Sequence, residues 1–151
     1  MDTTTSLAKA YRESQIISWA MIAGLGFYAG VVELFILQNA SFAGFAPEKV
    51  RDFKDYFILG GLLAFILIRT ARNAVLRIDP DQTLDMRLSK LKTANIVAYA
   101  IAEIPVVLGL VLFMFTGNRH DFYALGAFSL LAMILYYPKM HHWEAWLQRK
   151  V

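Results

Sequence analysis

Four runs of apolar residues, separated by polar segments, dominate the chain. They cover residues 15–37, 55–76, 93–115 and 121–137. The first and third runs have the roughly 20 residues that a bilayer core requires, whereas the second ends in arginines and the fourth is shorter. The pattern predicts an all-α protein, an integral membrane bundle of four antiparallel helices that forms a single transmembrane domain over residues 1–151.

The polar connections predict short helices at the membrane surface. Leu84, Leu88 and Leu91 fall on one face of a helix predicted over residues 82–92, and Pro47 followed by acidic residues predicts a helix start over residues 46–55. Beyond the fourth run, residues 139–150 place Trp143 and Trp146 among cationic residues. This composition is typical of an interfacial helix, so we expect both tryptophans at the membrane interface.

The distribution of lysine and arginine predicts the orientation. Eleven of these residues lie in the two chain ends, the middle connection and the adjoining end of the second run: Lys9, Arg12, Arg69, Arg72, Arg77, Arg87, Lys90, Lys92, Lys139, Arg149 and Lys150. The two other loops hold four: Lys49, Arg51, Lys54 and Arg119. Positive charge collects on the cytoplasmic side of membrane proteins. We therefore expect a multi-pass protein of a bacterial-type inner (cytoplasmic) membrane, with both termini in the cytoplasm.

Composition argues against several other classes of protein. Hydrophobic residues make up 58% of the chain and charged residues 18%, which is too apolar for a soluble domain of this size. The net charge of +3 comes from residues at the ends of apolar runs, without the basic stripe that nucleic-acid binding needs. Cysteine is absent, and no nucleophile–base pair or phosphate loop is present. We expect no enzymatic activity, no metal site, no cofactor and no nucleic-acid partner.

Small residues and one proline suggest where helices approach closely. The first run contains Gly24, Gly26 and Gly30, and Gly26 and Gly30 have the spacing of a close helix contact. The third run contains Pro105 and Gly109. Proline removes one backbone hydrogen bond, so Pro105 predicts either a kink for packing or a polar notch. These five residues are our candidates for helix packing.

Two segments suggest an internal repeat. Residues 55–60 read Asp-Tyr-Phe-Ile-Leu-Gly and residues 121–126 read Asp-Phe-Tyr-Ala-Leu-Gly. A duplication would make the bundle two hairpins related by an axis normal to the membrane, that is, parallel repeats. The alternative is that apolar helices resemble one another by composition alone.

The strongest candidate for function is Glu103, an acidic residue near the middle of the third run. A carboxylate at that depth costs several kcal/mol unless it is neutral, paired or beside a water-filled path. Arg69 is predicted at a similar depth in the second run, so the two could form a buried ion pair. If they do not meet, Glu103 is a candidate proton or cation site.

The residues around Glu103 resemble those of a known family. Residues 102–111, Ala-Glu-Ile-Pro-Val-Val-Leu-Gly-Leu-Val, are similar to the ion-carrying helix of the rotary ATPase proteolipid (c) subunit, in which a glycine follows the embedded carboxylate by six residues. The resemblance covers about one helix and implies an ion-carrying role for Glu103. The whole pattern is also similar to small four-span bacterial inner-membrane proteins of unknown activity, which implies no mechanism.

These observations leave three functions open. We expect a small accessory or assembly subunit of a larger membrane complex, because four spans enclose little interior of their own. The first alternative is an oligomeric proton or cation pathway built on Glu103. The second is a lipid-binding or quinone-binding membrane protein. The expected partners are the lipid bilayer together with other membrane subunits or further copies of the chain.

Overall fold

The described part of the chain is helical, with short connections between the helices. The computed structural model describes residues 3–39, 42–46, 48, 54–77 and 82–148. Its helices are α1 (Thr3–Gln38), α3 (Lys54–Val75), α4 (Leu84–Ala102), α5 (Ile104–Thr116), α6 (Arg119–Leu135) and α7 (Met140–Leu147). The all-α prediction is confirmed for these residues.

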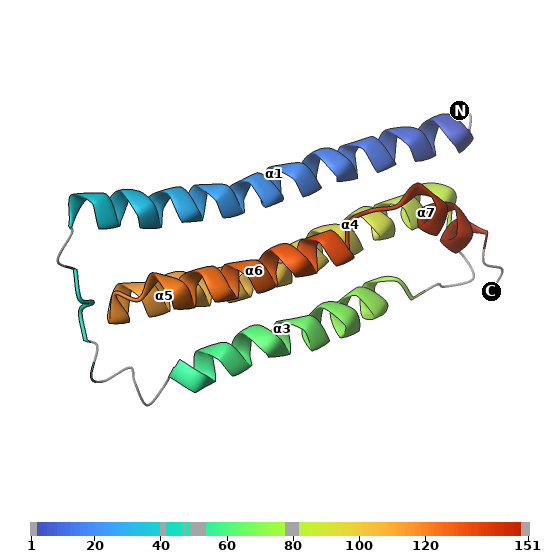
Figure 1. Cartoon of the computed structure of the whole chain (residues 1–151). Helices are drawn as coiled ribbons and strands as arrows, with labels where there is room; N and C mark the ends of the chain where they lie inside the picture. The colour runs from blue at the N-terminus through green and yellow to red at the C-terminus, as the bar shows by residue number, and fades with distance from the viewer. Residues whose placement is uncertain (1–2, 40–41, 47, 49–53, 78–81, 149–151) are drawn as a thin grey trace.

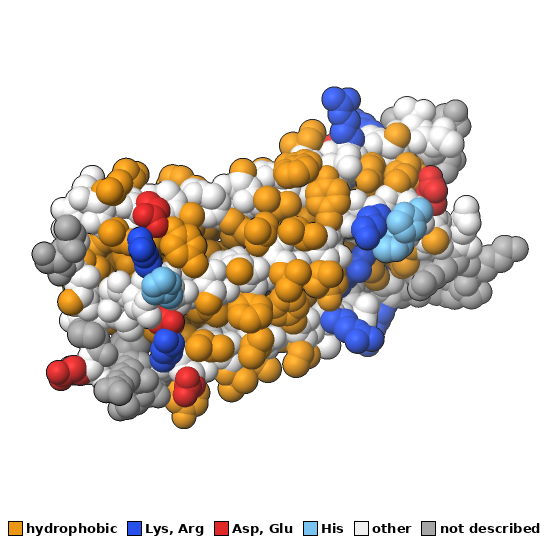
Figure 2. Space-filling model, viewed as in Figure 1, with side chains coloured by type: hydrophobic (Ala, Val, Ile, Leu, Met, Phe, Trp, Pro, Cys, Tyr) orange, Lys and Arg blue, Asp and Glu red, His pale blue; other side chains and the backbone are white. Residues whose placement is uncertain are grey.

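Three helical segments are long and apolar enough to cross a bilayer. They are α1, α3 and the combined α4–α5 segment, whereas α6 reaches that criterion only together with α7, from which it bends by 53°. Figure 2 shows hydrophobic side chains over the middle of the visible face, with charged side chains gathered toward both ends. A multi-pass membrane protein is therefore consistent with the fold, and the fourth span remains a prediction.

The helix boundaries follow from local sequence signals. Thr83 caps α4 by accepting a hydrogen bond from the Met86 N–H, and Asn118 caps α6 by accepting one from the His120 N–H. Gly117 ends α5 with φ of 69°, a left-handed conformation that favours glycine. Pro138 follows the end of α6, where the missing N–H prevents the helix from continuing.

Two helices begin earlier in the chain than the apolar runs predict. The short helix predicted over residues 82–92 is continuous with the third span, because α4 runs from Leu84 to Ala102 without interruption. The polar lead-in before residue 15 likewise belongs to α1, which begins at Thr3. The helix predicted over residues 46–55 lies largely outside the described residues.

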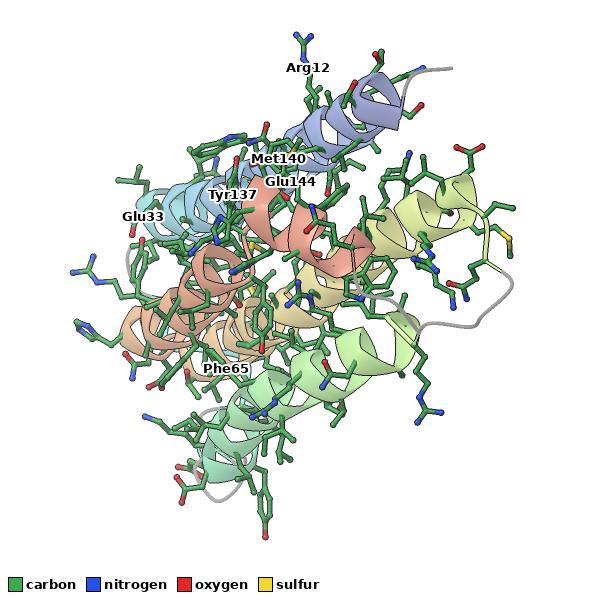
Figure 3. The ribbon with its side chains drawn as sticks, turned by 90° about the vertical axis from the view of Figure 1, so that its right-hand side faces the viewer. Arg12, Glu33, Phe65, Tyr137, Met140 and Glu144 are labelled. Atoms are coloured by element: carbon green, nitrogen blue, oxygen red, sulfur yellow. The ribbon has the colours of Figure 1, made fainter. Side chains whose placement is uncertain are left out.

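The helices form a layered bundle in which α4–α5 and α6 occupy the middle. Figure 1 shows α1 on one side of this pair and α3 on the other, and Figure 3, seen from one end, shows the same order. The closest packing is between α5 and α6, followed by α3 against α4, and α1 makes its main contact with α4. We call the end that holds α7 and the start of α1 the terminal end, and the opposite end the loop end.

The two predicted hairpins are not equivalent in this arrangement. The two-residue connection of Gly117 and Asn118 forces α5 and α6 to be antiparallel neighbours. A connection of 15 residues (39–53) joins α1 to α3, and these two helices do not pack together. Because a long connection leaves its helices free to separate, the first predicted hairpin is not a packed unit, and parallel repeats receive no support from the contacts.

Small residues allow the closest approach at the centre of the bundle. A Cβ on Gly109 would lie 3.1 Å from the Leu125 Cβ and 3.2 Å from the Phe122 Cα, so α5 and α6 touch there almost backbone to backbone. A Cβ on Gly61 of α3 would lie 2.8 Å from a Leu125 methyl group. Gly61 of α3 and Gly109 of α5 therefore both pack against Leu125 of α6.

Trp143 and Trp146 lie inside the protein at the terminal end. Their exposed fractions are 3% and 8%, and they pack with residues from the starts of α1 and α4: Ala10, Leu88 and Leu91. The Tyr11 ring meets the Trp143 ring edge to face at 5.7 Å. Because α7 folds back across the bundle end (Figure 3), both tryptophans pack inside the protein, and their expected position at the membrane interface stays a prediction.

Candidate functional site

The third span is interrupted beside its acidic residue. α4 ends at Ala102, Glu103 forms a turn, and α5 begins at Ile104 with Pro105 in its first turn. The Glu103 N–H still bonds the Tyr99 carbonyl oxygen at 3.0 Å, and its own carbonyl accepts from the Val107 N–H at 3.1 Å. The backbone thus bends only locally, so the two half-helices stay in one span.

Ser129 of α6 completes the hydrogen bonding at this break. Its Oγ accepts a hydrogen bond of 2.9 Å from the Val106 N–H, which is one of the unpaired donors at the start of α5. Ser129 is fully buried. The serine was not among our candidates, although a lone hydroxyl in an apolar run opposite a proline is a signal that could have identified it.

The Glu103 side chain lies against α1 near the middle of the span. A Cβ on Gly24 would lie 3.8 Å from the Glu103 Oε1, an ordinary van der Waals distance, so the carboxylate is a direct neighbour of Gly24. By helical rise, Gly24 is about 14 Å from residue 15 and about 20 Å from residue 37. Glu103 is partly buried. A mid-span carboxyl group is therefore positioned at the α1–α4 seam.

Within the described part of the chain, the Glu103 carboxylate has no hydrogen-bond or ion-pair partner. The predicted pair with Arg69 is not formed: Arg69 is exposed on α3, and α3 lies across α4–α5 from α1 (Figure 1). The sequence places the two residues at a similar depth in the membrane. Equal depth does not bring them together, because it does not determine which side of the bundle each helix occupies. The carboxylate is left facing α1 and the exterior.

Buried polar groups join α4 to α1 and to α6 between Glu103 and the terminal end. The Asn95 amide donates to the Ser14 Oγ at 2.9 Å and to the Ser18 Oγ at 3.0 Å. The Ser18 hydroxyl donates to the Ser14 carbonyl oxygen at 2.9 Å, and the Tyr99 hydroxyl donates to the Met133 carbonyl oxygen at 3.1 Å. Such bonds stabilise helix pairs in lipid, where apolar contact alone discriminates poorly.

Asn95 and Tyr99 of α4 and Glu103 at the break are spaced four residues apart, so polar groups follow one side of the helix as far as the break. Toward the loop end the packing around α1 and α5 becomes apolar, in the cluster of Val32, Val106, Phe113 and Phe122. Beyond the Ser129 bond to the Val106 N–H, the next polar contact there is the hydrogen bond from the Tyr123 hydroxyl to Glu33. The buried side chains of Ser14, Ser18 and Asn95 all lie between Glu103 and the terminal end.

Ion pairs lie near the two ends of the bundle. Lys92 contacts Glu13 at 2.6 Å, and Lys54 contacts Asp121 at 2.7 Å. The first pair links α4 to α1 toward the terminal end, and the second links α3 to α6 at the loop end. Both ion pairs therefore lie away from the middle section that contains Glu103.

Two of the predicted packing glycines are unused within the chain. A Cβ on Gly26 or on Gly30 would meet nothing within 4 Å. Because Gly24 and Gly26 are two residues apart on a helix, they point to nearly opposite sides of α1. The Gly26 side is therefore open, whereas the Gly24 side holds the carboxylate.

No family model, curated protein or solved structure matches the chain. The resemblance of residues 102–111 to the proteolipid subunit remains a prediction.

Proposed function

We propose that this protein is a small integral membrane accessory subunit that joins a larger membrane complex through the surface around Glu103. The single observation that carries the proposal is the mid-span carboxylate with no partner in the described part of the chain. A carboxyl group at such depth is expensive when it faces lipid. A helix of another subunit that brings a hydrogen-bond donor to the α1–α4 seam would remove that cost.

The open glycine face adds support of a different kind. Gly30, where a Cβ would meet nothing within 4 Å, leaves its part of α1 free for close approach by a second helix, on the side away from Glu103. Exposed large apolar side chains also cover α3, among them Leu59, Ile66 and Leu67. A subunit with several such faces can contact lipid and partner helices at once.

The test is purification of the tagged protein from native membranes in mild detergent. We expect partner subunits to copurify with the wild-type protein and to be lost with Glu103→Leu, while Glu103→Gln, which can still accept a hydrogen bond, retains part of them. Glu33→Gln is the matched control, because Glu33 already has a partner in Tyr123. Recovery of a lone monomer from wild-type membranes would contradict the proposal.

A second candidate function is an oligomeric proton or cation pathway. The observation that favours it is the row of Asn95, Tyr99 and Glu103, which carries polar groups from the terminal end to the carboxylate. The apolar cluster beyond Glu103 offers no such groups, so the other half of the path would come from a neighbouring subunit. In this role Glu103 would bind and release the ion.

Two measurements separate the candidates. A carboxylate-reactive carbodiimide should label Glu103 in a pH-dependent manner if the residue exchanges protons with solvent. Reconstituted Glu103→Gln protein should then lose flux while its assembly stays intact. Normal flux in that variant would rule out the pathway and leave the accessory subunit.

A further inference from the structure

The seam between α1 and α6 is hollow, on the opposite side of α1 from Glu103. Two adjoining hollows of about 380 and 500 Å³ share Ile22 and Leu130 in their lining. The first extends to Tyr123 and Ala29 toward the loop end, and the second extends to Trp19 and Lys139 toward the terminal end. Together they form one groove along the seam. In Figure 1, α6 lies in front of α5, so the α1–α6 side of the bundle faces the viewer.

The groove has the chemistry and the length of a lipid chain site. Its walls are apolar side chains, and two glycines, Gly26 and Gly126, provide the room. From Tyr123 to Ile134 the helical rise gives about 16 Å. One leaflet of a bilayer has about 15 Å of hydrocarbon. A single acyl chain that lies along the groove would therefore reach from the terminal end past the middle of the bilayer.

Cationic side chains lie at the terminal end of the groove. Lys139 lines the groove itself, beside Tyr137 and Trp19, whose rings meet edge to face at 5.9 Å. Lys139 and Tyr137 also line a small hollow shared with Arg72 and His142. Among the described residues neither Lys139 nor Arg72 forms an ion pair. Figure 2 shows lysine, arginine and histidine side chains gathered at this end of the apolar belt.

We propose that the α1–α6 groove binds one acyl chain of an anionic phospholipid, whose phosphate contacts Lys139. The apolar walls fit the chain, and the unneutralised cations fit an anionic headgroup. Aromatic rings such as those of Trp19 and Tyr137 commonly lie at headgroup level, where one edge contacts hydrocarbon and the other contacts water. The proposal is independent of the role of Glu103, because the two surfaces lie on different sides of α1.

Fluorescence quenching tests this site directly, because Trp19 lies at its mouth with 62% exposure. The full chain is reconstituted in phosphatidylcholine vesicles that contain a minor fraction of either brominated phosphatidylglycerol or brominated phosphatidylcholine. We expect the anionic lipid to quench Trp19 about fivefold more effectively, the preference that one lysine near an anionic surface provides. Trp19→Phe measures the background from Trp143 and Trp146.

Matched variants identify the two parts of the site. Lys139→Gln should abolish the preference for the anionic lipid, whereas Arg12→Gln, which removes one charge from a side chain that points away from the bundle in Figure 3, should preserve it. Gly26→Leu should fill the groove and reduce the preference. Gly30→Leu, an equally open position that does not line the groove, should not.

Several results would overturn the proposal. Equal quenching by the two brominated lipids would indicate a neutral occupant or none. Protection of Trp19 from both lipids would indicate a protein segment in the groove. A preference that survives both Lys139→Gln and Gly26→Leu would place the lipid elsewhere.

Discussion

In the described part of the bundle, the buried serine and asparagine side chains have hydrogen-bond partners, whereas the Glu103 carboxylate has none. Ser14, Ser18, Asn95 and Ser129 each form at least one hydrogen bond within the protein. Unpaired polar groups in lipid cost several kcal/mol, so these contacts specify how the helices face one another. Glu103 stands apart because its carboxylate makes no such contact in the described part of the chain.

Ser129→Ala tests the structural half of this division. The change removes the acceptor of the buried Val106 N–H, and we expect a loss of about 1–2 kcal/mol in the free energy of unfolding in detergent. Thr70→Val is the matched control, because the Thr70 hydroxyl is exposed and donates only to carbonyl groups of its own helix. Equal stability of the Ser129→Ala and wild-type proteins would show that the Val106 N–H finds another acceptor.

At the scale of elements, packing depends on where each helix presents its small residues. Gly61 and Gly109 bring α3 and α5 close to α6, whereas Gly26 and Gly30 contact nothing within the chain. The glycine spacing in the first run is the stronger sequence motif, yet the close contact uses glycines without that motif. A motif indicates that a helix can approach another, and only the neighbouring helix decides whether it does.

Gly109→Ala compares these two kinds of glycine. The added methyl group would lie 3.1–3.2 Å from the Leu125 Cβ and the Phe122 backbone, so we expect a loss of about 1 kcal/mol or more in the free energy of unfolding. Gly30→Ala should be neutral or stabilise by up to about 1 kcal/mol, because alanine is the better helix former and the position is open. Denaturation of both variants in the same detergent measures the difference, and a reversed order would contradict the packing described above.

At the scale of the whole molecule, the charges near the ends and the apolar middle are consistent with a bilayer. The start of α1 and α7 share one end of the bundle, while the α5–α6 turn lies at the other (Figure 1). The excess of lysine and arginine predicts that the terminal end faces the cytoplasm. The fold is compatible with either orientation in the membrane, so the orientation requires an experiment in cells.

Labelling of introduced cysteines tests the orientation, and the native chain contributes no background because it has no cysteine. A membrane-impermeant maleimide should modify His120→Cys in intact cells, because the start of α6 is predicted outside. Ser6→Cys, at the terminal end, should react only after the membrane is opened. The opposite pattern would reverse the predicted orientation, and labelling of both residues from one side would contradict the predicted four-span arrangement.

The sequence by itself determined the helical class, most of the apolar segments and the unusual position of Glu103. These properties depend on local hydrophobicity and on residues such as Thr83, Gly117 and Pro138, whose effects on the backbone need no distant partner. The sequence also showed that Pro105 would disturb the third span, although it did not reveal the capping by Ser129.

Only the tertiary structure decided which residues face one another. It separated Arg69 from Glu103, buried Trp143 and Trp146, and opened a groove between α1 and α6. Each of these results depends on the order in which helices pack around α4–α5, and many such orders are compatible with the same pattern of apolar residues. Depth along a helix can be read from the chain, whereas the direction of a side chain around the bundle depends on every neighbouring helix.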